Sequence, residues 1–414
     1  MLLSSHWEGY RTETERAFRK WHQEKYGTDV VFDWRDVGGT SDMLKFVQSE
    51  FTQRPQGIGI DLFFGGGIDP YMRLKDLGLL ARHQPDGAIM EGIPIEINGL
   101  PMYDPDFEWF GTAISGFGIL TNKRVTGIMK LPEVKTWEDL ADPRLESWIS
   151  SGDPRASGSA AALYEIILQA YGWDEGWRII KSMSGNIRSF NKNSSMAAKE
   201  ATFGDVAYCL AIDVHGLNQV SSAGPENMTF IYPEGLTIIN PDALAILKGA
   251  PNGQIARRFV DFMLSPEGQK LWVLPKGAPG GPEKFDIPRM SILPALYDLY
   301  PPDTGFINPF TTPTKLRYDA KRAASRRDVV QAVIGSTVID LHNELVKAWK
   351  KINDPKLSPQ RREELLAQFA RPPMTEEEAA RIAAEDWNDP TKRNQWLQKW
   401  QNDAVKEYRS LQKQ

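Results

Sequence analysis

Hydrophobic and polar positions in the first 110 residues predict strands and helices in alternation. Apolar residues recur near a helical period between Glu8 and Tyr26, and Gly27 is a typical helix stop. β-Branched and aromatic runs at residues 30–34 and in IDLFFGGG predict strands, and each run leads into a small polar loop. The repetition of strand, loop and helix predicts a parallel sheet whose loops meet at the carboxyl ends of its strands.

Two long stretches, the uncharged residues 109–122 and the mostly apolar residues 230–247, predict extended segments that connect two domains. A second series of strands and helices lies between them, which predicts an inserted domain and a discontinuous first domain. We expect a ligand cleft at the domain junction, where small molecules often bind. The expected bounds are 1–112 plus 240–300 for lobe I and 113–239 for lobe II.

The pattern changes after about residue 300. A proline-rich stretch, YPPDTGFINPFTTPT, predicts a linker, and the remaining chain has the periodicity of helices alone. One long helix is predicted from the apolar positions Val329, Val330, Val333, Ile334, Val338, Leu341 and Leu345. Residues 301–414 are therefore expected to form a helical C-terminal extension.

Composition narrows the function. The 414 residues include 49 Lys and Arg against 54 Asp and Glu, and the net charge of −5 argues against a nucleic-acid partner. Cys209 is the single cysteine, so an intramolecular disulfide is excluded, and its setting in VAYCLAI predicts a buried strand. The five histidines lack metal-ligand spacing, and no apolar run suits a membrane helix. No metal site is expected.

The first residues bear on location. MLLSSHWEGY begins almost inside the first expected strand. Such a start is typical of an exported protein whose signal peptide was removed and replaced by a start methionine. We therefore expect a periplasmic or extracellular protein, with the presence of a native N-terminal lipid anchor left open.

The segment GDPRASGSAAALYEIILQAYG, residues 152–172, is the strongest candidate for a binding site. Ser157, Gly158 and Ser159 come at the start of an amphipathic helix, where backbone N–H groups lack partners and the helix dipole is positive. Hydroxyls beside an uncovered backbone predict a cradle for phosphate or carboxylate. The alternative is an N-cap serine with close helix packing. Similar loops recur in SSHWEG, GGTSD, FFGGG and NKNSSMA, so several could converge on one cleft.

Acidic and aromatic side chains add further candidates. Asp213 follows a hydrophobic strand and Glu234 lies in YPEG, so both carboxylates could accept hydrogen bonds from ligand hydroxyls or an amine. The alternatives are a helix N-cap for Asp213 and a turn position for Glu234. His6 and Trp7 are candidates for the cleft wall, although Trp7 is equally consistent with a core position.

Catalytic motifs that a sequence can reveal are absent. The chain has no G-x-S-x-G elbow and no P-loop, and GFGILT and GIGIDL do not complete the dinucleotide pattern. This favours binding without chemistry, and neither a catalytic residue nor a cofactor is expected.

Several ordered motifs resemble a known family. They are HWEGYRTETERAF, DVGGTSDMLKF, IDLFFGGG, DPRASGSAAALYEIILQAYGW, GDVAYCLAIDVHG and INPDALAILKGAPN. Together they are similar to an extracellular (periplasmic) solute-binding protein of ABC importers, family 1, in the branch of ferric-iron and phosphorylated-solute binders. The resemblance covers roughly residues 1–300. It implies a type II periplasmic-binding fold, with two α/β lobes that are joined by two crossing strands and close around a ligand.

The resemblance also implies partners. An ABC permease and an ATPase are expected, with membrane contact only through the permease or a removed N-terminal anchor. A monomer that binds a small anionic organic ligand and no nucleic acid is expected. The helical extension is the departure from the family, and it could serve a partner or act as a lid.

The ligand class follows from comparison with the branch. Ferric-iron binders carry an adjacent tyrosine pair, whereas Tyr208 of this chain stands alone. Binders of phosphorylated solutes present serines and helix starts to an anion and acidic residues to polar groups, with His6 or His215 nearby. The expected ligand-binding residues are His6, Trp7, Thr40, Ser41, Gly66, Ser115, Ser157, Gly158, Ser159, Asp213 and Glu234.

The expected function is therefore a solute receptor of an ABC import system for a phosphorylated or phosphonate solute. One alternative is a receptor for ferric iron or another metal. Another is a ligand-sensing subunit of a signalling system. A phosphate-using enzyme comes last.

Overall fold

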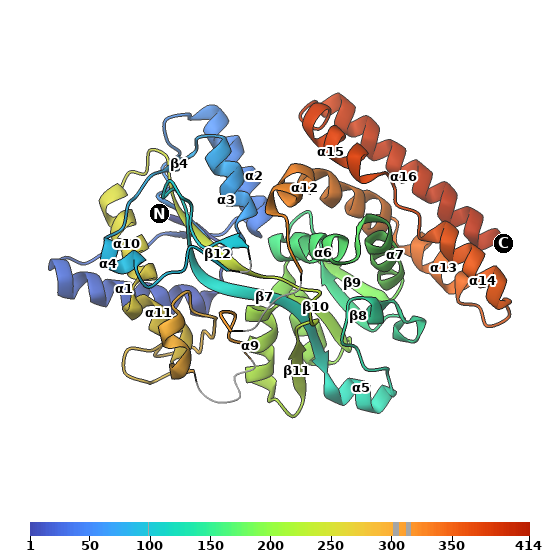
Figure 1. The fold of residues 1–414 in the computed structure, drawn as a ribbon, viewed down its shortest axis with the longest axis horizontal. Coiled ribbons are helices and arrows are strands. Elements are labelled where there is room, and N and C mark those ends of the chain that lie inside the picture. The colour runs from blue at the N-terminus through green and yellow to red at the C-terminus, as the bar shows by residue number, and fades with distance from the viewer. Residues whose placement is uncertain (98, 301–305, 312–315) are drawn as a thin grey trace. The chain divides into compact units, whose positions relative to one another are not determined.

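The computed structural model describes residues 1–97, 99–300, 306–311 and 316–414 (Figure 1). The chain divides into unit 1, residues 1–116 and 239–313, and unit 2, residues 117–238 and 314–414. The sequence placed the first division at 112/113 and treated residues 301–414 as a separate extension, whereas the helices after residue 314 group with unit 2. Residues 301–305 and 312–314 of the expected linker lie outside the described ranges.

Unit 1 contains a mixed β-sheet with a parallel portion. Its strands are β1 (Leu2–Ser4), β2 (Trp34–Arg35), β3 (Leu62–Phe64), β4 (Leu80–Ala81), the first part of β7 (Phe110–Asn122) and β12 (Ile239–Leu247). Strand β1 lies between β2 and β3 and runs parallel to both, while β12 pairs antiparallel with β3 and β7. The parallel portion was predicted, and it brings the loops after β1, β2 and β3 to one edge of the sheet.

Helices cover the sheet of unit 1. They are α1 (Glu8–Tyr26), α2 (Thr40–Gln53), α3 (Asp69–Asp76), α4 (Gly87–Met90), α10 (Gly253–Leu264) and α11 (Pro266–Val273), with the 3-10 turn η3 (Pro294–Leu299) and the short pair β5 (Glu96–Ile97) and β6 (Leu100–Pro101). Helix α1 ends where Gly27 adopts a left-handed φ of 71°, as predicted. Phe18 of α1 is fully buried and packs on Phe259 and Phe262 of α10. Each such ring contributes about 1.5–3 kcal/mol by leaving water.

Unit 2 has its own sheet. It contains the second part of β7, β8 (Ile149–Gly152), β9 (Ile187–Asn191), β10 (Tyr208–Ile212) and β11 (Met228–Ile231). Strands β9, β8 and β10 are parallel, and β10 and β11 pair antiparallel with β7. Cys209 is buried in β10 opposite Leu120, as predicted. The carboxyl ends of β8, β9 and β10 lead into helices α6 (Gly158–Tyr171), α8 (Ser194–Phe203) and α9 (Asp213–Ala223).

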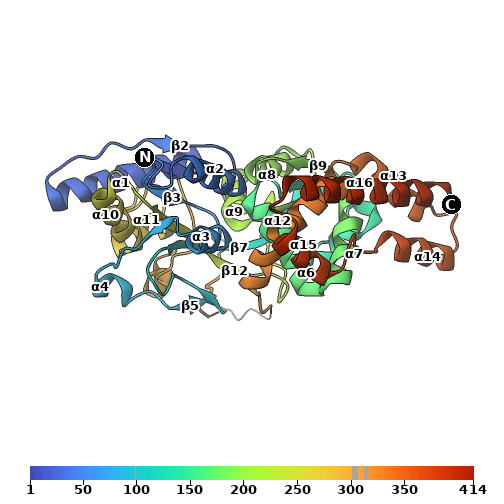
Figure 2. The same cartoon turned by 90° about the horizontal axis from the view of Figure 1, so that it is seen from above.

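The helices between the strands of unit 2 are α5 (Lys123–Met129), η1 (Glu138–Ala141), η2 (Pro143–Leu145), α6 (Gly158–Tyr171), α7 (Trp173–Ser184), α8 (Ser194–Phe203) and α9 (Asp213–Ala223). The C-terminal helices of the same unit are α12 (Ala320–Ile334), the π-helical turn η4 (Gly335–Ile339), α13 (His342–Ile352), α14 (Pro359–Phe369), α15 (Glu376–Glu385) and α16 (Pro390–Lys413). Figures 1 and 2 both show α16 beside α13.

The single long helix predicted across Val329–Leu345 is wrong. The structure divides it into α12, the turn η4 and α13, with non-helical backbone at Leu341. Gly335 and the β-branched run Thr337–Ile339 explain the interruption, because these residues have low helix propensity. The Thr337 hydroxyl also donates to the Val333 carbonyl at 2.7 Å. In the described ranges, no helix is long and apolar enough to cross a membrane.

Candidate functional site

Three serine hydroxyls meet at the starts of α6 and α8 in unit 2. Ser157 is the N-cap of α6, and its side chain accepts from the N–H of Ala160. Its Oγ lies 3.1 Å from Ser159 Oγ and 2.6 Å from Ser194 Oγ, and Ser159 donates to Ser194 at 2.9 Å. We call Ser157, Ser159 and Ser194 the serine cluster. The structure thus contains the N-cap of the alternative interpretation and adds a hydroxyl from a second helix.

Gly152, at the end of β8, lets the two helix starts approach. A Cβ at this position would lie 2.7 Å from Ser194 Oγ and 2.8 Å from Ala160 Cβ, closer than real Cβ contacts. Near the cluster, the backbone N–H groups of Gly158 and Ser159 form no hydrogen bond to a described residue. Hydroxyls and available N–H groups at a positive helix end are the donors that suit a phosphate or carboxylate.

The predicted acidic residues of unit 2 occupy different settings. Asp213 is the first residue of α9, is 1% exposed and accepts a hydrogen bond from the Tyr232 hydroxyl at 3.1 Å. The N-cap alternative for Asp213 is wrong, because Ile212 holds that position without a side-chain cap. Glu234 is exposed in a turn after β11, as its alternative expected, and His215 lies partly exposed on α9.

In unit 1, predicted residues gather at the carboxyl edge of the parallel strands. Thr40 and Ser41 are buried at the start of α2, after β2. Gly66, after β3, has a left-handed φ of 91°, and a Cβ there would lie 2.5 Å from Thr40 Cγ2. Thr40 and Gly66 are therefore in contact, and glycine is needed at this position for both backbone and space.

His6, in the loop after β1, is bonded within unit 1 through both ring nitrogens. Its Nδ1 lies 2.8 Å from Ser4 Oγ, and its Nε2 lies 3.1 Å from Arg289 Nη1. A guanidinium only donates, so Nε2 accepts and the ring proton belongs on Nδ1. Burial lowers the pKa of His6, which favours the same neutral form. In this arrangement His6 supports the loop rather than presenting a free ring nitrogen to a ligand.

Arg289 joins His6 to the strands β7 and β12. It is 2% exposed, and its Nη2 donates to the Asp242 carboxylate and, at 3.2 Å, to Ser115 Oγ. Burial alone raises the pKa of Asp242, but the charge of Arg289 and the contact with His6 hold it below its usual range. Ser115, predicted as a ligand residue, is buried as a partner of Arg289. This group of charges is neutral overall.

Trp7 packs against the core of unit 1, whereas Asn240 has a carboxamide that is available for hydrogen bonding. Trp7 is the N-cap residue of α1, without a side-chain cap, and its ring packs edge-on against Phe285 at 5.5 Å, which supports the core interpretation.

Asn240 on β12 is 7% exposed, and its carboxamide forms no hydrogen bond with a described residue. A Cβ on Gly67 would lie 2.8 Å from Asn240 Nδ2, so the carboxamide lies beside the Gly65–Gly67 loop.

Sequence reasoning missed Asn240, Asp242, Ser194 and Arg289. A usable signal existed for the first two, because INPDA places polar residues inside an otherwise apolar extended run. Ser194 lay in the quoted loop NKNSSMA without being singled out. Arg289 had no local signal, since its partners are remote in the sequence.

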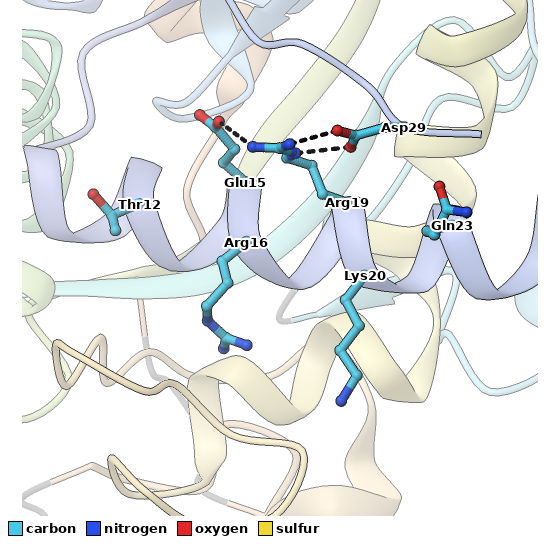
Figure 3. A pocket seen from close by; sticks show the side chains of 7 residues that line it. All are labelled: Thr12, Glu15, Arg16, Arg19, Lys20, Gln23 and Asp29. Atoms are coloured by element: carbon cyan, nitrogen blue, oxygen red, sulfur yellow. Dashed lines mark hydrogen bonds and ion pairs between the residues drawn. The ribbon is translucent and has the colours of Figure 1, made fainter. Parts of the chain in front are cut away.

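Two hollows of unit 1 lie apart from these residues. Figure 3 shows a surface groove of about 620 Å³ along α1, where Arg19 is paired with Asp29 and lies near Glu15. A smaller cavity of about 270 Å³ lies at the amino ends of β1 and β3. Neither lining contains a predicted site residue. Within the described part of the chain, no three His, Cys, Asp or Glu residues are grouped so that they could hold a metal ion.

Comparison with known proteins identifies relatives by sequence. The family model described as bacterial extracellular solute-binding protein matches residues 60–288. An uncharacterized protein of Haemophilus influenzae is 29% identical over 254 residues, which cover 60% of this chain and 68% of that protein. The phosphoglycerate transport regulatory protein PgtC of Salmonella typhimurium is 26% identical over 159 residues, 38% of this chain and 39% of PgtC. The match therefore spans well under half of PgtC.

Solved structures share the fold. The periplasmic binding protein AfuA of Actinobacillus pleuropneumoniae, solved with exogenous fructose-6-phosphate bound, has a TM-score of 0.64 at 20% identity, covering 86% of this chain and 98% of AfuA. The periplasmic binding protein P5PA has a TM-score of 0.66 at 17% identity, covering 81% and 98%. The ferric binding protein of Campylobacter jejuni has a TM-score of 0.59 at 19% identity, covering 83% and 98%. At these identities the likeness establishes the fold, with two α/β lobes and here an additional C-terminal helical region.

Proposed function

We propose, on the premise that this chain belongs to the bacterial extracellular solute-binding protein family, that its solute is a small organic anion with a phosphate or phosphonate group. Members of the family are receptors of ABC import systems and work with a permease and an ATPase. A monomeric state and capture by closure of the two lobes stay predictions. Closure would lower the radius of gyration in solution scattering when ligand is added.

The serine cluster carries the proposal. Phosphate oxygens accept hydrogen bonds, and Ser157, Ser159 and Ser194 can turn their hydroxyls toward such an acceptor. The N–H groups of Gly158 and Ser159 are available beside them. A hydrogen bond to a charged group contributes about 1.5–3 kcal/mol, so two or three of them suffice for selective binding.

The names of the relatives support the same class. AfuA was solved with fructose-6-phosphate, and PgtC is named for phosphoglycerate transport. Both compounds carry hydroxyl groups beside the phosphate. In unit 1, the carboxamide of Asn240 can donate to and accept from a hydroxyl, and the neutral set of His6, Asp242 and Arg289 adds no net charge there. Unit 1 therefore offers groups that suit a ligand hydroxyl, and the serine cluster of unit 2 offers donors that suit an anion.

A thermal-shift and calorimetry panel tests the proposal. The compounds are inorganic phosphate, fructose-6-phosphate, 3-phosphoglycerate, an alkylphosphonate and ferric ion. A phosphorylated compound should raise the melting temperature by mass action, and Ser157→Ala should weaken its binding by about 10-fold or more. Ser195→Ala is the matched control. Ser195 lies next to Ser194 at the start of α8, but its hydroxyl donates to Asn193 and not to the serine cluster. Equal affinities of the two variants would remove the serine cluster from the site.

A ferric-iron receptor is the second candidate, since ferric-binding proteins share the fold. Tyr208 argues for ranking it second. Its hydroxyl donates to the Pro132 carbonyl, and burial raises the pKa of Tyr208 to about 12. Iron ligation needs the phenolate, which this setting disfavours. Uptake of ferric ion with a visible charge-transfer colour, and no response to any phosphorylated compound, would reverse the order. The name of PgtC keeps a regulatory or sensing role as a third candidate.

A further inference from the structure

The loop that leads into α6 forms an ion pair with a residue of the C-terminal helical region. We call residues 153–157 the α6 entry loop. Its turn is closed by hydrogen bonds from the N–H groups of Ala156 and Ser157 to the Asp153 carbonyl. The Arg155 guanidinium bonds to the Asp153 carboxylate at 2.8 Å and, through Nη1, to Asp340 at 2.9 and 3.1 Å. Arg155 therefore links the loop that ends at Ser157 to the residue that follows η4.

The π-helical turn η4 is shaped for this contact. A Cβ on Gly335 would lie 2.5 Å from Arg155 Cδ and 2.8 Å from its Nε, so the arginine stem lies directly against the glycine backbone. The Asp340 N–H donates to the Gly335 carbonyl at 2.9 Å, which places both ends of η4 near Arg155. Single π-helical turns inside helices are frequent at functional sites.

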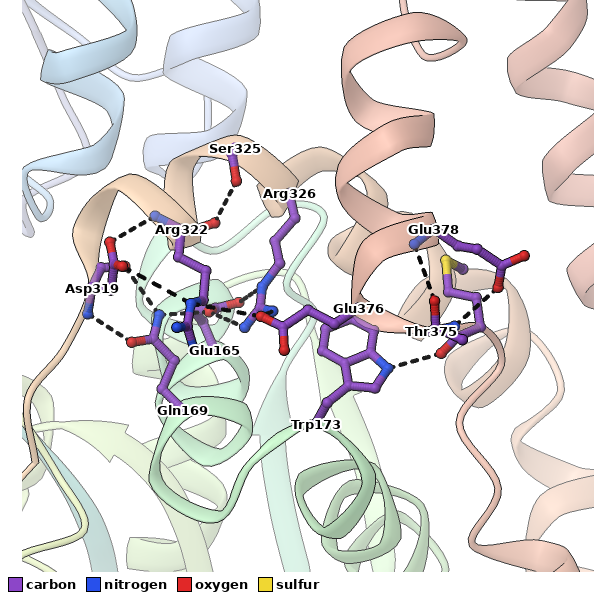
Figure 4. A network of polar contacts seen from close by, with 11 residues as sticks. Glu165, Gln169, Trp173, Asp319, Arg322, Ser325, Arg326, Thr375, Glu376 and Glu378 are labelled. Carbon is purple, nitrogen blue, oxygen red and sulfur yellow. Dashed lines mark hydrogen bonds and ion pairs between the residues drawn. The ribbon is translucent and has the colours of Figure 1, made fainter.

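A second set of contacts holds the other half of α6 (Figure 4). Arg326 of α12 donates to Glu165 at 2.7 Å, and its guanidinium lies 4.7 Å from the centre of the Trp173 ring. Gln169 donates to the Asp319 carbonyl at 3.1 Å and accepts from the Asp319 N–H at 2.7 Å. Helix α6 is therefore fixed to the C-terminal helices at its entry loop and again two to three turns later.

We propose that the C-terminal helical region is a positioning element for the binding site of unit 2. Asp340 and Gly335 hold Arg155, Arg155 holds the entry loop, and the loop sets the position of Ser157 within the serine cluster. The effect on anion affinity rests on the proposed function, whereas the effect on the loop does not. The extension thus has a role in ligand binding without touching the ligand.

Amide hydrogen exchange of the ligand-free full chain tests the positioning role. Asp340→Asn removes the charge that holds Arg155, so the hydrogen-bonded amides of Ala156, Ser157, Ala160 and Ala161 should exchange about two- to fivefold faster. Asp340→Glu should restore slow exchange. Gly335→Ala should act like Asp340→Asn, because its methyl group displaces the Arg155 stem.

Lys350→Gln is the matched control. Lys350 and Glu146 form a comparably exposed ion pair at 2.5 Å between a C-terminal helix and the rest of unit 2, without contact to the entry loop. If Asp340→Asn and Lys350→Gln leave exchange of residues 156–161 equally slow, the positioning role is refuted.

Binding of the phosphorylated compound found in the panel is measured on the same variants. Weaker binding by Asp340→Asn but not by Lys350→Gln, at equal melting temperature, supports the link to affinity. Fast exchange with unchanged affinity overturns that link and keeps the positioning role. A failure of Ser157→Ala to alter binding, with fast exchange in Asp340→Asn, counts against the proposed function alone.

Discussion

The Arg326–Glu165 ion pair leads to a stringent prediction about stability. Arg326 is 2% exposed and Glu165 is 6% exposed, so replacing Arg326 by Met leaves a carboxylate buried without its cation. Breaking a buried pair in this way costs about 3–5 kcal/mol. Gln169 donates to the same carboxylate at 2.8 Å and offsets part of that cost. We therefore expect the free energy of unfolding to fall by an amount near the lower end of this range. For a unit of this size, a loss of about 3 kcal/mol lowers the melting temperature by roughly 6–12 °C.

Urea unfolding followed by circular dichroism measures this cost. The double variant Arg326→Met with Glu165→Met removes both charges and should recover about half of the loss or more, because an apolar pair of similar volume often replaces a buried ion pair without penalty. A loss below about 1 kcal/mol for Arg326→Met would be typical of an exposed pair and would refute the reasoning. A double variant as unstable as the single one would assign the loss to packing instead of charge.

Two further predictions concern unit 1. Burial and the charges of Arg289 and Arg11 lower the pKa of His6 from 6.5, although the carboxylate of Asp242 acts in the opposite direction. The unfolded chain therefore takes up a proton that the folded chain resists, and stability should fall as pH drops below about 6.5, by at most ~1.4 kcal/mol per pH unit for this group. Urea melts at pH 7.5 and 5.5 should show this slope, and it should shrink in His6→Gln; an unchanged slope contradicts the assignment. Asn240→Ala should lower the affinity for fructose-6-phosphate by about 5-fold or more, which is the effect of one lost hydrogen bond. The affinity for inorganic phosphate should change by less than about twofold, because inorganic phosphate has no sugar hydroxyl for Asn240 to bind. Equal losses for both compounds in calorimetry would exclude hydroxyl recognition by Asn240.

Local patterns predicted much of the fold. Alternation of strand, loop and helix identified the parallel portion of each sheet, and Gly27 and Ser157 have the helix-terminal roles that their residue types favour. Such features depend on neighbours within a few residues, which is the range that periodicity and capping rules describe. The break within residues 329–345 was also local, but the apolar period outweighed Gly335 and the β-branched run.

The contacts that organise the candidate site were beyond that range. His6 and Arg289 are 283 residues apart, and Ser157 and Ser194 are 37 apart. Their meeting depends on which strands are adjacent, and a single sequence does not specify strand order. The same holds for Arg155 and Asp340, 185 residues apart, which is why the C-terminal helices could be recognised as helices but not assigned to unit 2.

Because of the π-helical turn, deletion of a single residue can change how the C-terminal region contacts the entry loop. A π turn holds one residue more than an α-helical turn, so deleting a single residue within Gly335–Ile339 would return the segment to α-helical register. At roughly 100° of rotation per residue, Asp340 would then point away from Arg155 while α12 and its ion pair with Glu165 stayed in place. Deletion of one codon would therefore remove the contact between Asp340 and Arg155 of the entry loop and leave the rest of the extension in the chain. Relatives that bear the extension could differ in ligand affinity through insertion or loss of that codon alone.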